Sequence, residues 1–168
     1  MTDVGQDSAS PRWSLEAKVL GLVGSVRDRA QGGPMSRGDR AELRRMRDAD
    51  ALPPEPFWTL VARYEIAARD EPFWRAVIPL MVEFRHRPGI TAGRALAAAR
   101  VSGSRVERWL RYDAARARSE AYRLLSKVED GFDWVRFARL LHNWDDNSKL
   151  GFARDYFLAP ELRTESAS

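Results

Sequence analysis

The sequence predicts an all-α protein made of two small helical bundles joined by a short linker. Apolar residues recur at helical spacing along nearly the whole chain, whereas the strict alternation of a half-buried strand is scarce. Glycine and proline interrupt this pattern at intervals that suit helix ends. With 168 residues, 44 % of them hydrophobic, the chain can form one domain or two small lobes on one core.

The lobe boundaries follow the breaks in the apolar pattern. We expect a disordered tail over residues 1–12, an N-terminal helical lobe over 13–88, a C-terminal helical lobe over 89–160 and a flexible tail over 161–168. The linker is placed near residues 86–91, where a proline and a glycine end a long apolar pattern.

Caps and breakers place the first two helices. Ser14 is a suitable N-cap for a helix whose apolar face runs from Leu15 to Val26. The segment 31–39 is rich in glycine and proline and is predicted to be a loop. A short basic helix is then expected over about residues 39–47.

Prolines mark the next two helices. Pro56 suits the first turn of a helix, where its missing N–H and fixed φ cost little. Asp70 is the expected N-cap of the following helix, whose apolar side runs from Phe73 to Phe84. Pro79 lies inside that pattern and should kink the helix, because it removes one backbone hydrogen bond.

The second lobe opens with a short helix capped by Thr91. Ser102 or Ser104 then caps a long helix, which we expect to run unbroken to about Val128.

The last two helices begin at acidic residues. Asp133 is the expected cap of a helix over 134–144, and a final helix begins at 145–147 and ends near Leu158.

Composition excludes several protein classes. The chain has no cysteine, so structural disulfides and zinc fingers are impossible, and two histidines make an all-histidine metal site improbable. The first residues lack the basic and apolar regions of a signal peptide, and no apolar run approaches the roughly 18–20 residues of a membrane span. We therefore expect a cytoplasmic protein with no membrane partner and no cofactor.

Basic charge is concentrated in two segments. The span from Arg94 to Arg139 holds eleven basic against six acidic residues, and the span from Arg27 to Arg47 holds seven against three, so the rest of the chain is net acidic. Of the 28 basic residues, 25 are arginine, whose planar fork of donors matches phosphate. A GC-rich genome also enriches arginine without any function, so the positions of the arginines must decide. The two segments suggest two halves of one surface that binds an anionic polymer.

The predicted long helix has one apolar stripe. At about 100° per residue its buried sector contains Val106, Leu110, Ala117, Ala121, Leu124 and Val128. Trp109 lies between this stripe and a basic flank, where it could stack on a base or close the edge of the core. The other tryptophans fall within helical patterns and are expected mainly in the core.

Arginines flank this stripe on both sides. Arg105, Arg108, Arg116 and Arg123 fall on one flank, and Arg111 and Arg118 fall on the other. On a continuous helix, Arg105 to Arg123 would span roughly 27 Å, enough to engage several phosphates. The alternative is a solvated face with ion pairs to Glu107 and Glu120.

Catalytic motifs are missing from the sequence. There is no phosphate-binding glycine loop and no nucleophile elbow, and no helix-turn-helix or RNA-recognition pattern points to base reading. His142, Asp145 and Asp146 have the spacing of a conceivable metal site, but the simpler role of the two aspartates is to cap the last helix. We predict neither a catalytic nor a metal-binding residue.

Ordered motifs in the second lobe resemble a known family. They are GRALA (93–97), SRVERWLRYD (104–113), RLL (123–125), DWVRFARLLHNW (133–144) and ARDYF (153–157), with weaker matches in LRRM (43–46), PFWTLVARY (56–64) and LMVEF (80–84). Over roughly 65 residues this order and spacing resemble the CasB family, the small subunit of the type I-E CRISPR surveillance complex, Cascade.

The resemblance implies an all-helical protein with two small bundles and no catalytic activity. Family members stack as two copies in Cascade, beside the backbone subunits that hold the guide RNA and near the large subunit. Their basic surface helps to hold the guide–target duplex and the displaced strand of the R-loop. DNA cleavage belongs to a separate nuclease-helicase, and sequence is read by guide pairing.

The resemblance also implies which arginines bind nucleic acid. The matching positions are Arg105, Arg111 and Arg123 in the second lobe, and Arg44 and Arg45 in the first. Two further candidates, Arg108 and Arg116, come from the helical projection, because they fall on the same flank as Arg105 and Arg123. One departure is at Asp145 and Asp146, where many members carry basic residues, so contacts of that turn are in doubt and Lys149 is the nearest remaining cation.

The sequence therefore predicts a non-enzymatic subunit of Cascade that contributes to antiviral defence. Its partners would be the other subunits, a second copy of itself, the guide RNA and the target DNA. The alternative is a helical scaffold whose arginines serve only contacts between subunits. A metal-dependent nuclease using Asp145 and Asp146 is a distant third hypothesis.

Overall fold

The computed structural model describes residues 13–47 and 52–163. Its elements are α1 (Leu15–Ser25), η1 (Arg29–Gln31), α2 (Arg37–Arg45), α3 (Glu55–Arg63), η2 (Ala68–Asp70), α4 (Glu71–Glu83), α5 (Ala92–Ala98), α6 (Gly103–Leu110), α7 (Ala114–Leu125), α8 (Trp134–Asn143), α9 (Asp146–Phe157) and α10 (Pro160–Arg163). The all-α prediction is confirmed, since these residues contain no strand. None of the described helices is long and apolar enough to cross a membrane.

Most predicted helix ends are confirmed. The side chains of Ser14, Thr91, Asp133 and Asp145 each accept a hydrogen bond from a backbone N–H in the first turn of the helix that follows. Asp70 occupies its predicted position but makes no capping hydrogen bond, because its backbone continues the turn of η2 into α4. The helix α4 runs through Pro79, and the predicted kink there stays a prediction.

The two predicted tails are covered only in small part. Residues 1–12 and 164–168 lie outside the described residues. At the C-terminal end the short helix α10 occupies positions 160–163, where the sequence predicted the start of a flexible tail.

The predicted long helix from Ser104 to Val128 is wrong, because the chain turns at residues 111–113. Asp113 is extended, with φ −67° and ψ 168°, and its carboxylate accepts a hydrogen bond from the N–H of Arg116 at 2.8 Å. The indole N–H of Trp109 donates to the carbonyl of Ala117 at 2.9 Å, which fixes α6 against α7. The residues of the predicted stripe are nevertheless buried or half-buried, since each helix keeps its own apolar face.

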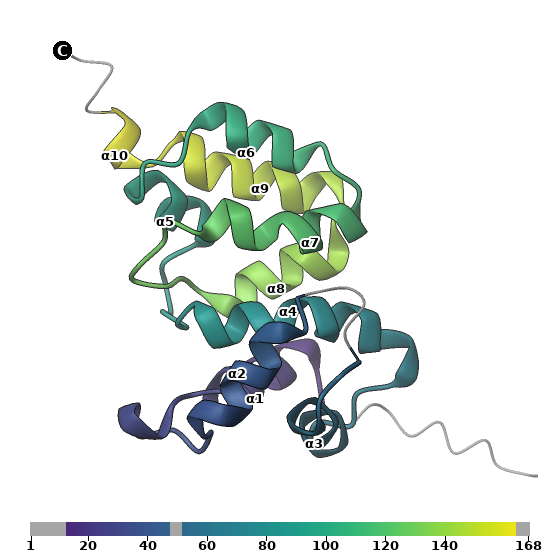
Figure 1. Cartoon of the computed structure of the whole chain (residues 1–168). Coiled ribbons are helices and arrows are strands. Elements are labelled where there is room, and N and C mark those ends of the chain that lie inside the picture. The colour runs from purple at the N-terminus through teal and green to yellow at the C-terminus, as the bar shows by residue number, and fades with distance from the viewer. Residues whose placement is uncertain (1–12, 48–51, 164–168) are drawn as a thin grey trace, which may run out of the picture.

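One continuous hydrophobic core joins the described helices. Figure 1 shows α1, α2 and α3 on one side, α5, α6, α7 and α9 on the other, and α4 and α8 between them. The helix α1 packs on α8, and α4 packs on both α7 and α8. The buried side chains of both predicted lobes therefore belong to a single cluster, and the division into two lobes stays an interpretation.

The predicted linker is held firmly by hydrogen bonds to the start of α8. The N–H of Arg87 donates to the carbonyl of Phe132 at 2.8 Å, and the N–H of Phe132 donates to the carbonyl of Arg85 at 3.1 Å. Gly131, at φ +80°, is in the left-handed region, and a side chain there would collide with the Arg85 carbonyl.

Two glycines offer a matched test of how closely α5 and α9 pack. A Cβ at Gly93 would lie 2.8 Å from the carbonyl oxygen of Phe152 and 2.9 Å from the N of Tyr156, whereas a Cβ at Gly151 would meet nothing within 4 Å. We expect Gly93→Ala to lower the free energy of unfolding by about 1–3 kcal/mol, because backbone must move. Gly151→Ala should be neutral or stabilising by up to about 1 kcal/mol. Urea denaturation of both variants measures the difference, and an equal effect would contradict the close packing.

Candidate nucleic-acid interface

Three of the predicted arginines form a row along the exposed side of α6. Val106 and Trp109 anchor the helix in the core, so the opposite side faces solvent. We define the α6 arginine row as Arg105, Arg108 and Arg111; all three are exposed. Successive members lie three residues apart, so the row spans about 9 Å along the helix axis. Within the part of the chain that the structure describes, none of the three side chains has an ion pair or hydrogen bond, so their donors are available to a ligand.

Arg116 extends this row beyond the end of α6. Its guanidinium lies 4.1 Å from the ring centroid of Tyr112, which directly follows Arg111. This stacking holds the charge beside the α6 arginine row while leaving the side chain exposed.

The flank predicted on one continuous helix is divided by the turn, so Arg123 lies with Arg116 on α7 and not on the helix that carries Arg105 and Arg108. Arg123 is two turns beyond Arg116, and its Nη1 is 3.6 Å from Oε2 of Glu120. Because the side chain of Arg123 is 82 % exposed, this ion pair is weak and exchangeable. The turn at Asp113 explains the difference, since it rotates α7 relative to α6.

The two arginines predicted in the first lobe differ from each other. Nε of Arg44 lies 2.6 Å from Oε1 of Glu83, and both side chains are partly buried, so this pair joins α2 to α4. Arg45 is exposed. The next arginine, Arg47, places its guanidinium 3.7 Å from the ring centroid of Tyr122 on α7. The basic end of α2 therefore reaches the second basic segment at α7.

The α6 arginine row and α2 lie on different sides of the fold. Figure 1 shows α9 and α7 between them. A binding surface that included both would have to cross α7, where Arg116 and Arg123 lie.

Arg118 has a structural role that the sequence pattern did not reveal. Its Nε and Nη2 both donate to the carbonyl oxygen of Leu141, at 3.1 and 3.0 Å, and its guanidinium lies 5.0 Å from the ring centroid of Phe73. Burial lowers the pKa of this side chain from its ordinary value. Arg118 therefore ties the end of α8 to α7 and α4 and is not part of a free basic surface.

Trp109 belongs to the core, so the base-stacking alternative for it is wrong. It is 2 % exposed, and its ring packs edge-on against Trp144 at 4.8 Å between centroids. Trp58 differs from the expected core role, because it is 45 % exposed on α3.

The residues of the conceivable metal site make capping and packing contacts instead. Asp145 accepts the backbone N–H of Ser148 at 2.7 Å, and this bond, followed by one from the Ser148 hydroxyl, holds its pKa below the ordinary value. The ring of His142 packs edge-on against Phe73 at 5.2 Å. Across residues 13–47 and 52–163, no three histidine or acidic side chains are placed to share a metal ion.

Comparison with solved structures identifies the fold. A chain of E. coli Cascade bound to a PAM-containing double-stranded DNA target superposes with a TM-score of 0.60 and 25 % identity, covering 87 % of this chain and 97 % of that one. M. ruber CasB gives a TM-score of 0.66 at 18 % identity, covering 92 % and 98 %. The chain is CasB-like. No protein-family profile and no curated protein matches it. The resemblance to the CasB family in the ordered sequence motifs is thus confirmed at the level of the whole fold.

Arg118 and Arg116, both on α7, allow a comparison of how much a half-buried, hydrogen-bonded arginine and an exposed arginine contribute to stability. We expect Arg118→Met to lower the free energy of unfolding by about 1–3 kcal/mol, because it leaves the Leu141 carbonyl without its donors. Arg116→Met should change it by no more than about 0.5 kcal/mol, as is usual for a surface position. Thermal and urea denaturation of the two variants check this, and a stable Arg118→Met protein would refute the structural role.

Proposed function

We propose that this CasB-like chain is the non-catalytic small subunit of a type I-E Cascade and binds nucleic acid through the backbone phosphates. The observation that carries the proposal is the α6 arginine row on a CasB-like fold, exposed and without side-chain partners among the described residues. The similar E. coli chain comes from a complex that holds target DNA, which supports the same ligand class here.

The chemistry of the row suits phosphate. Each guanidinium offers a fork of N–H donors that matches phosphate oxygens, and arginine stays charged at any physiological pH. The members project from one face of a rigid helix, so their order along a strand is fixed. Contacts of this kind supply affinity and register without reading bases, which guide pairing does in RNA-guided complexes.

The remaining predicted arginines differ in how directly each would contact nucleic acid. Arg116 extends the row, and Arg123 can contribute by exchanging its exposed pair with Glu120 for a phosphate. Arg45 would reach nucleic acid only on a path across α7, and Arg44 acts mainly as the clamp to Glu83. In the assembled complex we further expect the other Cascade subunits, a second copy of this chain, the guide RNA and the target DNA as partners, in the cytoplasm.

A salt series on the reconstituted complex tests the proposal. The measured quantity is the slope of log affinity for target DNA against log salt concentration. When Arg105, Arg108 and Arg111 are changed together to Ala, the magnitude of this slope should fall by roughly 2–3. Each phosphate left without its arginine lowers it by about 0.7–0.9. The matched control replaces three other exposed arginines, Arg37, Arg69 and Arg87, with the same reduction of charge.

The control variant should keep the slope within about one unit of wild type. An unchanged slope in the triple variant of Arg105, Arg108 and Arg111 would contradict the proposed contacts between these arginines and phosphates. A loss of assembly with unchanged DNA binding by the assembled fraction would instead favour the scaffold alternative, in which arginines serve only subunit contacts.

A further inference from the structure

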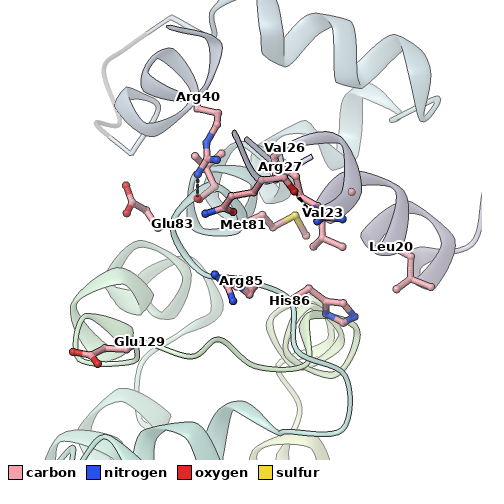
Figure 2. Close-up of a pocket in the computed structure, with 13 residues that line it drawn as sticks. Leu20, Val23, Val26, Arg27, Arg40, Met81, Glu83, Arg85, His86 and Glu129 are labelled. Atoms are coloured by element: carbon pink, nitrogen blue, oxygen red, sulfur yellow. Dashed lines mark hydrogen bonds between the residues drawn. The ribbon is translucent and has the colours of Figure 1, made fainter. Parts of the chain in front are cut away.

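The exposed arginines at the turn between α6 and α7 are held in place indirectly. Figure 2 shows the direct way of fixing an arginine elsewhere in the fold, where Arg40 donates to a backbone carbonyl of α4 at 3.0 Å. Arg111 has no such acceptor within the described residues, and the guanidinium of Arg116 lies on the ring of Tyr112, 4.1 Å from its centroid. The placement of both side chains therefore depends on the backbone of the turn.

Trp144 has a backbone conformation that is unusual for so large a residue. It ends α8 with φ +45° and ψ +39°, in the left-handed region that glycine and asparagine normally occupy at helix ends. Its N–H donates to the carbonyl of Leu140 at 2.8 Å, so the chain turns from α8 towards α9 at this residue. A left-handed backbone at a bulky residue persists only where the surrounding contacts hold it there. The contacts of the indole therefore indicate what Trp144 does in the fold.

The indole of Trp144 reaches the α6–α7 turn, 32 positions earlier in the chain. Its N–H donates to the carbonyl of Tyr112 at 2.8 Å, and its ring packs edge-on against Trp109 with 4.8 Å between the centroids. Figure 1 shows the turn from α8 into α9 beside the turn from α6 into α7. The accepting carbonyl belongs to the peptide that joins Tyr112 to Asp113, and Asp113 in turn caps α7 through the N–H of Arg116. One hydrogen bond thus fixes the peptide on which the position of Arg116 depends.

The packing of α6 on α7 does not itself need this bond. Trp109 is buried and already joins the two helices, since its indole N–H donates to the carbonyl of Ala117 at 2.9 Å. Trp144 and Tyr112 are only partly buried, so water can replace the indole as a donor to the Tyr112 carbonyl. Loss of the Trp144 N–H should therefore loosen the turn while leaving the core intact.

The charge of the α8–α9 turn does not extend the α6 arginine row. Asp145 and Asp146 are both exposed there, and Nζ of Lys149 lies 4.9 Å from the ring centroid of Trp144. The pKa of Asp145 is held below its ordinary value mainly by the hydrogen bond from the N–H of Ser148, with a smaller contribution from the charge of Lys149. The turn therefore acts on the nearby arginines through Trp144 and not through a charge of its own.

We propose that Trp144 is a positioning residue for the phosphate contacts of the proposed function, on which this inference rests. Its indole N–H holds the Tyr112 carbonyl and thereby sets the positions of Arg111 and Arg116. These two arginines then continue the line of the α6 arginine row, so that one strand meets all of them in order. Trp144 acts through these arginines and touches no phosphate itself.

An aromatic side chain without the indole N–H tests the proposal. Trp144→Phe keeps a ring and removes the donor, and Trp144→benzothienylalanine keeps the whole bicyclic shape with sulfur in place of the N–H. The matched control is Trp58→Phe, which removes an indole N–H that donates to the carbonyl of Pro53 at 3.2 Å on the helix α3. None of the three changes alters the net charge of the chain.

The first measurement is the slope of log affinity for target DNA against log salt concentration in the reconstituted complex. Both variants of Trp144 should lower its magnitude by roughly 1–2, because each arginine that loses its phosphate lowers it by about 0.7–0.9. Trp58→Phe should leave the slope within about 0.5 of wild type. Since the net charge is the same, a smaller slope reports displaced arginines, which a purely structural role of Trp144 would not produce.

The effect must act through Arg111 and Arg116. When both are changed to Ala, Trp144→Phe should lower the slope no further, because the groups that it positions are already missing. A further fall of about one unit in that background would overturn the proposal, since it would place the action of Trp144 elsewhere. A wild-type slope in both single variants of Trp144 would overturn it as well.

Amide hydrogen exchange in the free chain separates this inference from the proposed function. The N–H groups of Arg116 and Ala117, which donate to Asp113, should exchange roughly fivefold faster or more in Trp144→Phe, and within about twofold of wild type in Trp58→Phe. Unchanged exchange in Trp144→Phe overturns the positioning role even where DNA binding depends on the arginines. An unchanged slope in the triple variant of the α6 arginine row is instead a failure of the proposed function and takes this inference with it.

Discussion

The burial of Trp134 at the start of α8 holds the two halves of the fold together. Its side chain is fully buried, its indole N–H donates to the carbonyl of Phe84 at 2.7 Å, and its backbone N–H donates to Nδ1 of His86 at 3.0 Å. These bonds join the end of α4 and the linker to the beginning of α8. Because Phe132 and Phe137 pack around the same ring, the two predicted lobes share one core at this point. The helices α6 and α7 are therefore placed relative to α1 and α2 by a rigid junction rather than by a flexible tether.

The arginines near this junction have hydrogen-bond acceptors within the fold, whereas those on α6 have none among the described residues. Near α4, guanidinium groups are drawn into the fold: Arg40 donates to the Val82 carbonyl, Arg44 pairs with Glu83, and Arg118 donates to the Leu141 carbonyl. A half-buried guanidinium needs such acceptors, since an unpaired one is costly to remove from water. On α6, by contrast, the buried side is filled by Val106 and Trp109, and the arginines opposite have no acceptors within the described residues. The arginines therefore fall into two groups, those whose donors are satisfied within the fold and those whose guanidinium groups stay exposed on α6.

The sequence predicted most helix starts because capping is local. Ser14 and Asp133 lie directly before apolar patterns and bond to backbone N–H groups two or three residues on, so each signal is contained in a few residues. The break at Asp113 was missed although the same kind of signal was present, since a continuous stripe from Val106 to Val128 also fits two helices that face one core. The partners of Arg44 and Arg118 lie 39 and 23 positions away, at Glu83 and Leu141, and only the folded structure brings them together. The exposed side of α6 could be predicted from the sequence, whereas the pairing of Arg44 and Arg118 with acceptors inside the fold could not.

The α6 arginine row differs electrostatically from the arginines beside α4. On α6, unpaired cations stand on a polar face, so the attraction for an anionic strand under the proposed function would be long-range and weakened by salt. Beside α4, by contrast, Arg40 lies 3.4 Å from Asp28 and Arg44 lies 2.6 Å from Glu83, so these charges are largely neutralised within the fold. The junction at Trp134 keeps α6 in a fixed relation to α1 and α2, so the α6 arginine row presents its charges in one orientation relative to the rest of the fold.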